Sequence, residues 1–544
     1  MLSYRKLAMR VLGRPLHTEG IDSPRPASQR AAALVLTAAM LTTLAAPAFA
    51  DIWRIEDGDI TVKAGETEGT NKVSQGTNKD VVDTNTIITN QNKDTTSSHT
   101  VTIETNDKND KVEVTLKDVN IDTSSRNKAA VSVTGEGDTN IKLDGDNALK
   151  SDIYRSGIYG SGSGSLTISG GENDSLTAQG GSGANGISSS GSLTISGGTV
   201  TANGDDGGRG ISSSGSVTIS GGSTVTANGG SGTISGGDGI WSGGGVTISG
   251  GSTVTANGGN GGSLVGGDGI RSGGGLTVSD GTVTAKGGNG DSKDGYGGDG
   301  IRSGGVVTIS GNTVNAAGGY GGKVGGYGIC SFDRVAISGG TVEAAGGNGS
   351  TGGGSGIYSS VIDLSGSLEL TAKAGSPTGK ALLQNGRELD LDTIKDKLGP
   401  GAKVTATDAN GDSKQVSIPR PVEPEEPVIP EESSSSSDGG SATPSAPVSP
   451  LPGLTVTDKD GPRISYTSTQ SGNALTVCVG RLTASLRISL AALRQMRAEG
   501  IETITFQTIL CSTTLSVDEL LAMGGEDAEA VLTHRFTDSS LTVD

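Results

Sequence analysis

The chain of 544 residues contains very little of three residue types on which catalysis and ligand binding often depend. It has three histidines, three cysteines and only 3% aromatic residues. His17 lies near the N-terminus, and we expect His99 and His534 to be solvated polar residues rather than acids or bases. The cysteines have no zinc-type spacing, and no cysteine–histidine pair stands out. These absences argue against a zinc protein and against a cysteine-based enzyme.

Positive charge is also scarce. The chain has 41 Lys and Arg against 59 Asp and Glu, a formal net charge of −18 at pH 7. An acidic chain is repelled by nucleic acids and by anionic membranes, so we exclude both as partners. This balance suits a soluble extracellular protein, or one that holds cations.

The chain has one long apolar run, close to its N-terminus. Residues 31–50 are uncharged, end in Ala48-Phe49-Ala50 and follow a region with several Arg and Lys residues. This arrangement predicts a secretory signal over residues 1–50, cleaved next to Asp51. The alternative is an uncleaved anchor, because 20 residues can span a bilayer. We expect a secreted mature chain, extracellular or held by cell-surface components, without membrane insertion.

The three cysteines fall into two regions. Cys330 lies in the repeats described next, whereas Cys478 and Cys511 share the C-terminal segment. Outside the cell the latter two could form a disulfide, but two buried thiols would fit equally well.

Glycine, with 93 residues, is abundant, and much of it belongs to a block that recurs about every 28 residues. The block reads Gly-Ile-x-Ser-Gly-Gly, then Leu/Val-Thr-Ile-Ser-Gly-Gly, then Thr-Val-Thr-Ala, then a glycine-rich stretch. Its isoleucines are Ile158, Ile187, Ile211, Ile240, Ile270, Ile301, Ile329 and Ile357. A near-fixed period of this length predicts an architecture of stacked repeats.

Apolar residues alternate with Ser and Thr inside each block, which predicts short strands with one buried face. Glycines would form the corners where the backbone needs a positive φ. Coils stacked about 4.8 Å apart would place Ile187, Leu193 and Ile195 on their equivalents in neighbouring coils. We therefore predict a right-handed parallel β-helix with three short strands per coil. A disordered Gly/Ser-rich tract would not keep aliphatic residues at matched positions.

The remaining sequence fits around this solenoid. Leu389–Leu398, Ser489–Glu499 and Ser516–Met523 are expected helices, the last with a capping box formed by Ser516 and Glu519. The predicted organisation is a signal (1–50), irregular N-terminal coils and cap (51–155), regular repeats (156–374), a C-terminal cap (375–418), a Pro/Ser/Glu linker (419–453) and a small α+β domain (454–544).

The residue after each repeat isoleucine should point outward, because strand side chains alternate. That column reads Tyr159, Ser188, Ser212, Trp241, Arg271, Arg302, Cys330 and Tyr358. An indole ring can stack on a sugar and a guanidinium can hold a carboxylate, so Trp241, Arg271 and Arg302 are candidate carbohydrate contacts. Tyr159 and Tyr358 extend the candidate column. The alternative is an exposed ladder kept varied for solubility. Length variation falls in the glycine-rich stretches, a feature typical of a binding face.

A second column lies two residues before the isoleucines and contains Asp238, Asp268 and Asp299, preceded by Arg209 and followed by Tyr327. Three stacked carboxylates would suit a hard cation such as Ca²⁺. The alternative is that each Asp caps its own turn.

Two further function classes stay open. Paired threonines such as Thr199/Thr201 and Thr224/Thr226 could form a flat ice-binding array, although outward Thr is also an ordinary β-surface residue. A polysaccharide lyase or glycosidase would need clustered carboxylates with a metal or a base. The stacked aspartates supply carboxylates, so catalysis stays undecided, and we expect a non-catalytic protein.

The units Asp268-Gly-Ile-Arg-Ser-Gly-Gly-Gly-Leu-Thr-Val-Ser and Asp299-Gly-Ile-Arg-Ser-Gly-Gly-Val-Val-Thr-Ile-Ser resemble those of a secreted carbohydrate-binding β-helix family of Gram-positive, clostridial-type bacteria. The resemblance covers residues 100–372 and implies binding of acidic polysaccharides such as polygalacturonate, with calcium. This chain departs from the pattern in its longer glycine loops and in having only three units with the Asp. The C-terminal segment resembles an uncharacterised module of secreted clostridial proteins, which implies no activity. The alternative function is a structural adhesin in which the solenoid is a spacer rod.

Overall fold

The structure is a computed structural model that describes residues 52–419 and 453–543, the latter with gaps at 458–462, 465, 472, 480, 482, 509–511, 524–527 and 536–537. The chain divides into two compact units, one up to Pro424 and one from Glu425 onward. The predicted signal (1–50) and nearly all of the predicted linker (419–453) lie outside the described residues.

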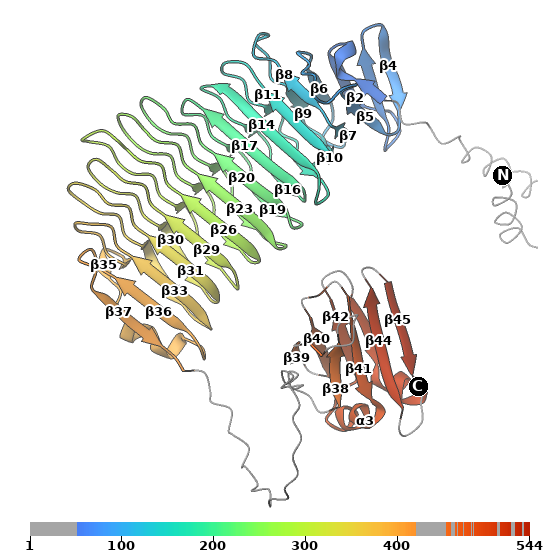
Figure 1. Cartoon of the computed structure of the whole chain (residues 1–544), viewed down its shortest axis with the longest axis vertical. Helices are drawn as coiled ribbons and strands as arrows, with labels where there is room; N and C mark the ends of the chain where they lie inside the picture. The colour runs from blue at the N-terminus through green and yellow to red at the C-terminus, as the bar shows by residue number, and fades with distance from the viewer. Residues whose placement is uncertain are drawn as a thin grey trace, which may run out of the picture. The chain divides into compact units, whose positions relative to one another are not determined.

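The first unit is a parallel β-solenoid of about 14 turns of about 28 residues, which confirms the predicted fold class. Figure 1 shows the coils following one another along the unit, with equivalent strands side by side. Each regular coil supplies one strand to each of three columns, and the paired strands within a column run parallel.

In the regular part of the first column, each strand begins at the isoleucine of a Gly-Ile pair. It consists of β2 (Ile60–Ala64), β6 (Val101–Thr105), β9 (Val131–Gly135), β12 (Ile158–Gly160), β15 (Ile187–Ser189), β18 (Ile211–Ser213), β21 (Ile240–Ser242), β24 (Ile270–Ser272), β27 (Ile301–Ser303), the first halves of β30 (Ile329–Ile337) and β32 (Ile357–Leu364), and β34 (Leu382–Gln384).

The second column carries the Leu/Val-Thr-Ile segments. It consists of β1 (Ile52–Arg54), β5 (Thr86–Thr89), β7 (Lys111–Lys117), β10 (Asp138–Asp144), β13 (Leu166–Ser169), β16 (Leu193–Ser196), β19 (Val217–Ser220), β22 (Val246–Ile248), β25 (Leu276–Val278), β28 (Val307–Ile309) and the second halves of β30 and β32.

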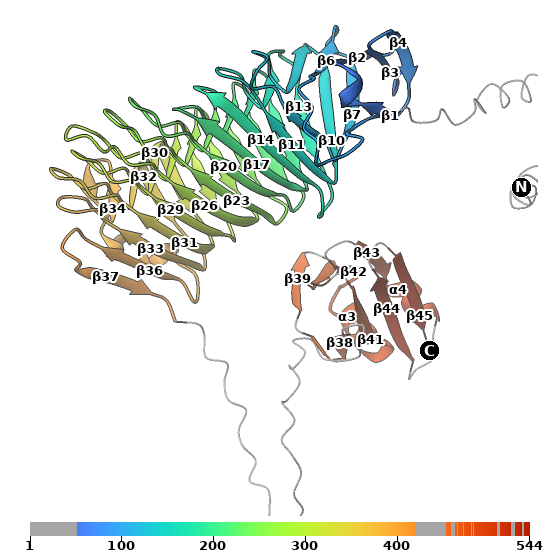
Figure 2. The ribbon, with the colours of Figure 1, turned by 45° about the horizontal axis from the view of Figure 1, so that its top comes forward.

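The third column carries the Thr-Val-Thr-Ala segments and forms the continuous face seen in Figure 2. It consists of β8 (Asn120–Asp122), β11 (Asp146–Lys150), β14 (Ser175–Ser182), β17 (Thr199–Asp205), β20 (Thr224–Asn228), β23 (Ser252–Asn257), β26 (Gly281–Lys286), β29 (Thr313–Ala317), β31 (Gly340–Ala345), β33 (Leu368–Lys373) and β36 (Lys403–Thr407).

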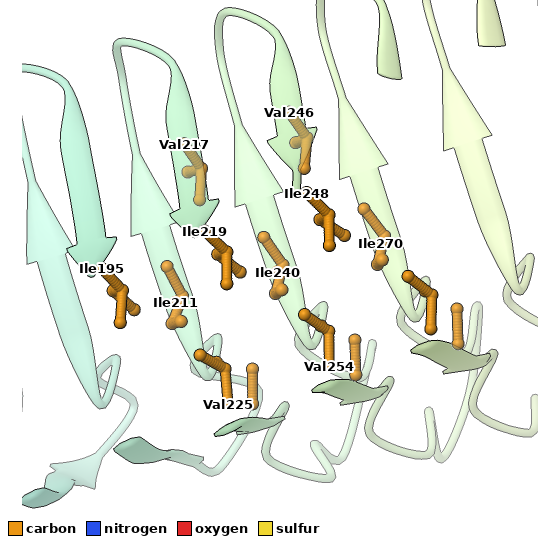
Figure 3. Close-up of a cluster of buried hydrophobic side chains, with 14 of the residues drawn as sticks. Ile195, Ile211, Val217, Ile219, Val225, Ile240, Val246, Ile248, Val254 and Ile270 are labelled. Atoms are coloured by element: carbon orange, nitrogen blue, oxygen red, sulfur yellow. The ribbon is translucent and has the colours of Figure 1, made fainter. Parts of the chain in front are cut away.

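The core of the solenoid is a set of aliphatic ladders. Figure 3 shows Ile219 and Val225 of one coil beside Ile248 and Val254 of the next, in equivalent positions. All four side chains are fully buried. Stacking buries an apolar face that a single coil would leave open to water, and this burial stabilises the repeat.

Glycine is required at two places for different reasons. At the corner between the second and third strands, Gly221 and Gly222 have φ of 67° and 70°, a conformation that favours glycine. The long glycine-rich stretches need glycine instead because neighbouring backbones approach closely. A Cβ on Gly259 would lie 2.1 Å from the carbonyl oxygen of Gly230 in the preceding coil. The prediction that glycines serve as positive-φ corners is therefore correct only for the first group.

Antiparallel strands cover both ends of the solenoid. At the N-terminal end, β3 (Asn71–Gln75) pairs with β2, and β4 (Asn78–Asp83) pairs with β3. A 3-10 helix, η1 (Ile55–Asp57), follows β1. At the C-terminal end, β35 (Arg387–Glu388) pairs with β34, and β37 (Ser413–Ser417) pairs with β36. Between them lies η2 (Leu391–Lys397), a 3-10 helix within the predicted helical segment.

The second unit has two four-stranded sheets and its own hydrophobic core. One sheet contains β38 (Leu454–Thr457), β41 (Thr483–Ser489), β44 (Glu529–Arg535) and β45 (Asp538–Val543), and the other contains β39 (Thr467–Ser471), β40 (Ala474–Cys478), β42 (Thr503–Gln507) and β43 (Ser512–Ser516). The two predicted helices are present as α3 (Leu490–Ala498) and α4 (Val517–Met523). In the predicted capping box, Glu519 N donates to Ser516 Oγ at 3.4 Å.

Candidate functional site

The predicted outward column is in register across consecutive coils. Trp241 of β21 pairs with Arg271 of β24, and Arg271 pairs with Arg302 of β27. The column continues through Cys330 to Tyr358. Two serines separate Tyr159 from Trp241, so Tyr159 lies apart from the arginines.

Two members of the column, Ser212 and Cys330, are buried rather than exposed as expected. Cys330 is 1% exposed, and burial raises the pKa of its thiol to about 12. Beyond it, Tyr358 is half-buried and stacks on Tyr327 with the ring centroids 5.1 Å apart. Buried Cys330 therefore separates Tyr358 from Trp241, Arg271 and Arg302, of which Arg271 is exposed and the other two are half-buried.

The aspartate column holds consecutive coils together. Asp238, Asp268 and Asp299 are 6%, 3% and 4% exposed. Oδ1 of Asp238 accepts a hydrogen bond from the backbone N–H of Asp268 at 2.9 Å, and Oδ1 of Asp268 accepts one from Asp299 N at 2.7 Å. Asp299 in turn accepts from Tyr327 N at 2.7 Å. Each carboxyl group thus caps the following coil, rather than its own turn as the alternative supposed.

Arginines provide the counter-charge for this column. Arg209 Nε lies 3.2 Å from Asp238 Oδ2, and its guanidinium carbon lies 4.4 Å from the centroid of the Trp241 ring. Arg302 Nη1 lies 3.9 Å from Asp268 Oδ2 and 3.7 Å from Asp299 Oδ2. From the sequence, Arg209 was identified only as the residue that precedes the aspartates in this column. Its position one coil before Asp238 is the signal that could have identified it as a site residue.

Burial changes the charge of the carboxyl groups. Desolvation, together with the neighbouring Asp299 and Asp238, raises the pKa of Asp268 to about 8. Desolvation also raises the pKa of Asp299 to about 6, against the opposing effect of Arg302. Near neutral pH the proton therefore stays on Asp268, and the carboxyl groups cancel less of the arginine charge than three ionised aspartates would.

The two columns meet in a pocket of about 590 Å³. Its lining includes the side chains of Arg209, Asp238, Asp268, Arg271 and Arg302, together with glycines of the adjoining loops. Arg271 is exposed and forms no ion pair with any residue in the described part of the chain. Trp241 is not in the lining, but it contacts the pocket through its stacking with Arg209. Among the described residues, Arg271 thus has no ion-pair partner, whereas Arg209 and Arg302 are paired with aspartates.

Glycine-rich stretches form one side of this pocket. We call the stacked stretches 229–239, 258–269, 287–300, 318–328 and 346–356 the glycine wall. Within it Gly237 N donates to Gly230 O, Gly259 N to Gly237 O, and Gly267 N to Gly259 O, at 2.8–2.9 Å. Isolated parallel bridges also join Gly232 to Gly261 and Gly261 to Gly290. The flank that varies in length is thus an ordered, hydrogen-bonded layer.

The residues fit Ca²⁺ poorly. Calcium takes six to eight oxygen ligands. Here one oxygen of each aspartate is used by a backbone N–H, and Arg302 faces the second oxygens of Asp268 and Asp299. Among the described residues no group of three or more His, Cys, Asp or Glu could hold a metal ion. A calcium requirement stays a prediction.

The threonine ladders lie on the third column. Thr199, Thr224, Thr253 and Thr282 are paired in succession, as are Thr201, Thr226, Thr255 and Thr284. The second ladder then changes to Asn315 and Glu343. The array is regular for only part of the face, and its function stays an open prediction.

His99 lies in the N-terminal coils, and His534 and Cys478 belong to the second unit. His99 is half-buried, with Nδ1 3.0 Å from Ile55 O. The expectation of a solvated His534 is wrong, because it is fully buried beside Phe506 and between the hydroxyls of Thr508 and Thr513. Burial lowers the pKa of His534. The Cys478 thiol lies 3.6 Å from Gln507 Oε1. Cys511 is outside the described residues, so the disulfide stays a prediction.

Comparison with known proteins adds no relative. No family model matches the chain, and no curated protein or solved structure matches it. Within the described ranges, no helix combines the length and apolar character needed to cross a bilayer. Function must therefore be inferred from the residues of the site itself.

Proposed function

We propose that the solenoid is a non-catalytic carbohydrate-binding protein that holds an acidic, uronate-type polysaccharide along its first column. The observation that carries this proposal is the guanidinium of Arg271, which is exposed and unpaired among the described residues and lies in a pocket beside Arg209 and Arg302. A planar guanidinium binds a carboxylate through two parallel hydrogen bonds. We also propose that the protein is secreted, which would bring the site into contact with extracellular polymers.

The local charge supports an anionic ligand even though the whole chain carries −18. Three arginines surround the pocket, and the raised pKa of Asp268 keeps that carboxyl group largely protonated near pH 7. The pocket therefore has a local excess of positive charge, which attracts a carboxylate at short range.

The repeat geometry supports a polymer rather than a single small anion. Arg271 and Arg302 occupy the same position in consecutive coils, so their backbones are about 4.8 Å apart along the solenoid. Trp241 lies in the next position of the same column. An extended chain with repeating carboxylates could contact several coils at once.

Binding of polygalacturonate by the chain lacking residues 1–50 tests the proposal, with Arg271→Gln as the main variant. Because Arg271 forms no ion pair with a described residue, its replacement should leave the coil intact while affinity falls about tenfold or more. Arg334→Gln is the matched control, since Arg334 is also exposed but lies in the second column. Equal affinity of all three proteins would contradict this site. The same assay with a chelator tests calcium, and release of unsaturated product would indicate a lyase instead.

A second candidate is a structural adhesin, favoured by the separate core of the second unit. In that case the solenoid is a spacer and residues 454–544 make the contact with a cell-surface component. Binding of polysaccharide by residues 51–418 alone, equal to that of the longer chain, would favour the first proposal. Binding only when residues 454–544 are present would favour the adhesin.

A further inference from the structure

A second pocket lies at the N-terminal end of the solenoid, on the outer side of the second column. Its volume is about 410 Å³. Its lining comes mainly from the strands β7, β10 and β13, with Asn71 of β3 and two turns. One turn is at Glu68–Gly69 between β2 and β3, and the other is at Thr84–Asn85 between β4 and β5. It shares no lining residue with the arginine pocket.

The pocket forms where the N-terminal antiparallel strands are hydrogen-bonded to the first coils of the solenoid. Asn71, the first residue of β3, is 6% exposed. Its Nδ2 donates to Glu113 O at 2.7 Å and to Thr86 Oγ1 at 2.9 Å. The turn that precedes β3 is thereby anchored to β5 and β7 of the second column, and it bounds the pocket.

The outward residues of the second column change character at this pocket. In the regular repeats the outward column reads Thr194, Thr218 and Thr247. In the pocket the same column reads Glu113 and Asn140 before it reaches Thr167. Glu113 and Asn140 thus line the concave surface at this end, at positions where the regular repeats carry threonines. Towards the other end the column changes again, to Ala336 and Asp363.

These polar groups are held in defined orientations. Asn140 Nδ2 donates to Glu113 Oε2 at 2.9 Å, and Asn140 Oδ1 accepts from Ser169 Oγ at 3.1 Å. Asp138 Oδ1 accepts from the backbone N–H of Ser165 at 3.1 Å. An amide has two N–H donors and a carboxylate has two oxygens, so each planar group keeps bonding capacity after these contacts. Pre-oriented polar groups of this kind suit directional recognition.

The charge of this pocket is opposite to that of the arginine pocket. Glu68, Glu113 and Asp138 are acidic, and Lys111 is the one basic residue in its lining. A uronate would be repelled. A neutral polyol can donate its hydroxyl hydrogens to the carboxylates and accept from Lys111 and the amides.

We propose that this pocket, formed around Glu113 and Asn140, is a separate binding site for a neutral, hydroxyl-rich saccharide unit. The proposal is independent of acidic-polymer binding, because it uses a different face, different residues and the opposite charge. A ligand with neutral and acidic sugars could contact both sites, but neither site requires the other.

The test uses the full chain lacking residues 1–50, a panel of neutral hexasaccharides of glucose, xylose, mannose and galactose, and a cationic glucosamine oligomer for comparison. Saturation-transfer NMR at about 1 mM ligand detects weak binding. The double variant Glu113→Ala/Asn140→Ala should weaken binding about tenfold or more, whereas Thr218→Ala, in the same column outside the pocket, should not. Arg271→Gln should also leave it unchanged, which separates this site from the acidic one.

Three outcomes would overturn the proposal. The first is that no neutral hexasaccharide binds. The second is that the double variant still binds the saccharide while its thermal melting matches that of the parent chain. The third is that only a cationic glucosamine oligomer binds. If the double variant melts early, Asn140→Ser, which keeps a hydroxyl in place of the amide, serves as a milder change. It should still weaken the saccharide signal selectively.

Discussion

The backbone N–H of Asp299 donates a hydrogen bond of 2.7 Å to Oδ1 of Asp268, the equivalent residue in the preceding coil. One carboxyl group therefore stabilises the stacking of coils and also lies in the lining of the arginine pocket. Structure and ligand affinity should consequently respond to the same proton.

Stability should decrease as pH rises. Burial raises the pKa of Asp268 from 3.8 to about 8, so the folded state retains a proton that the unfolded state has lost between these values. For each carboxyl group with such a raised pKa, the free energy of unfolding falls by at most about 1.4 kcal/mol for each unit of pH increase. Melting at pH 5, 7 and 9 should show a falling midpoint. Asp268→Asn can still accept from Asp299 N, and it should flatten the slope. A midpoint that rises with pH in the parent would contradict the assignment.

Affinity for polygalacturonate should also decrease with pH. The uronates stay ionised between pH 6 and pH 9, while Asp299 and then Asp268 lose their protons, with pKa values of about 6 and about 8. The new negative charge opposes the arginines, so affinity should fall about three- to tenfold over this interval. Titrations at constant ionic strength measure it. Asp268→Asn should retain most of its affinity at pH 9; an equal loss in this variant would exclude the carboxyl group as the cause.

Much of the solenoid could be predicted because its determinants repeat. Ile240 and Ile270 are paired and fully buried, as expected when alternating residues face inward at equivalent positions. The same register predicted that Trp241 and Arg271 lie side by side in consecutive coils, as they do. This register depends on strand geometry alone, which is why it could be read from one chain.

The features that escaped prediction depend on contacts between segments without a local signal. The burial of Asp268 arises from the stacking of its coil between two others. The side-chain partners of His534 lie more than twenty positions earlier, at Phe506, Thr508 and Thr513, which its neighbours in sequence do not indicate. The N-terminal pocket requires the anchoring of Asn71 to Glu113, a contact between residues 42 positions apart.

The glycine wall should not tolerate a methyl group at its contact positions. In Gly259→Ala the new Cβ would lie 2.1 Å from Gly230 O, so the two backbones must separate. We expect a loss of about 1–3 kcal/mol in the free energy of unfolding, measured by denaturant titration. Gly352→Ala is the matched control, because its Cβ would meet only side chains, at 3.5 Å or more, without a positive φ. Equal stability of the two variants would show that the wall is loosely packed.

Trp241 should affect binding through Arg209. The guanidinium of Arg209 lies over the indole ring at 4.4 Å while its Nε pairs with Asp238, so the ring holds this arginine at the edge of the pocket. Trp241→Ala should lower polygalacturonate affinity about two- to fivefold, the size of an exposed cation–π contact, whereas Trp241→Phe should lose less. A double-mutant cycle with Arg209→Gln distinguishes the two roles of the ring. Coupled effects indicate positioning of Arg209, and independent effects indicate that Trp241 contacts the sugar directly.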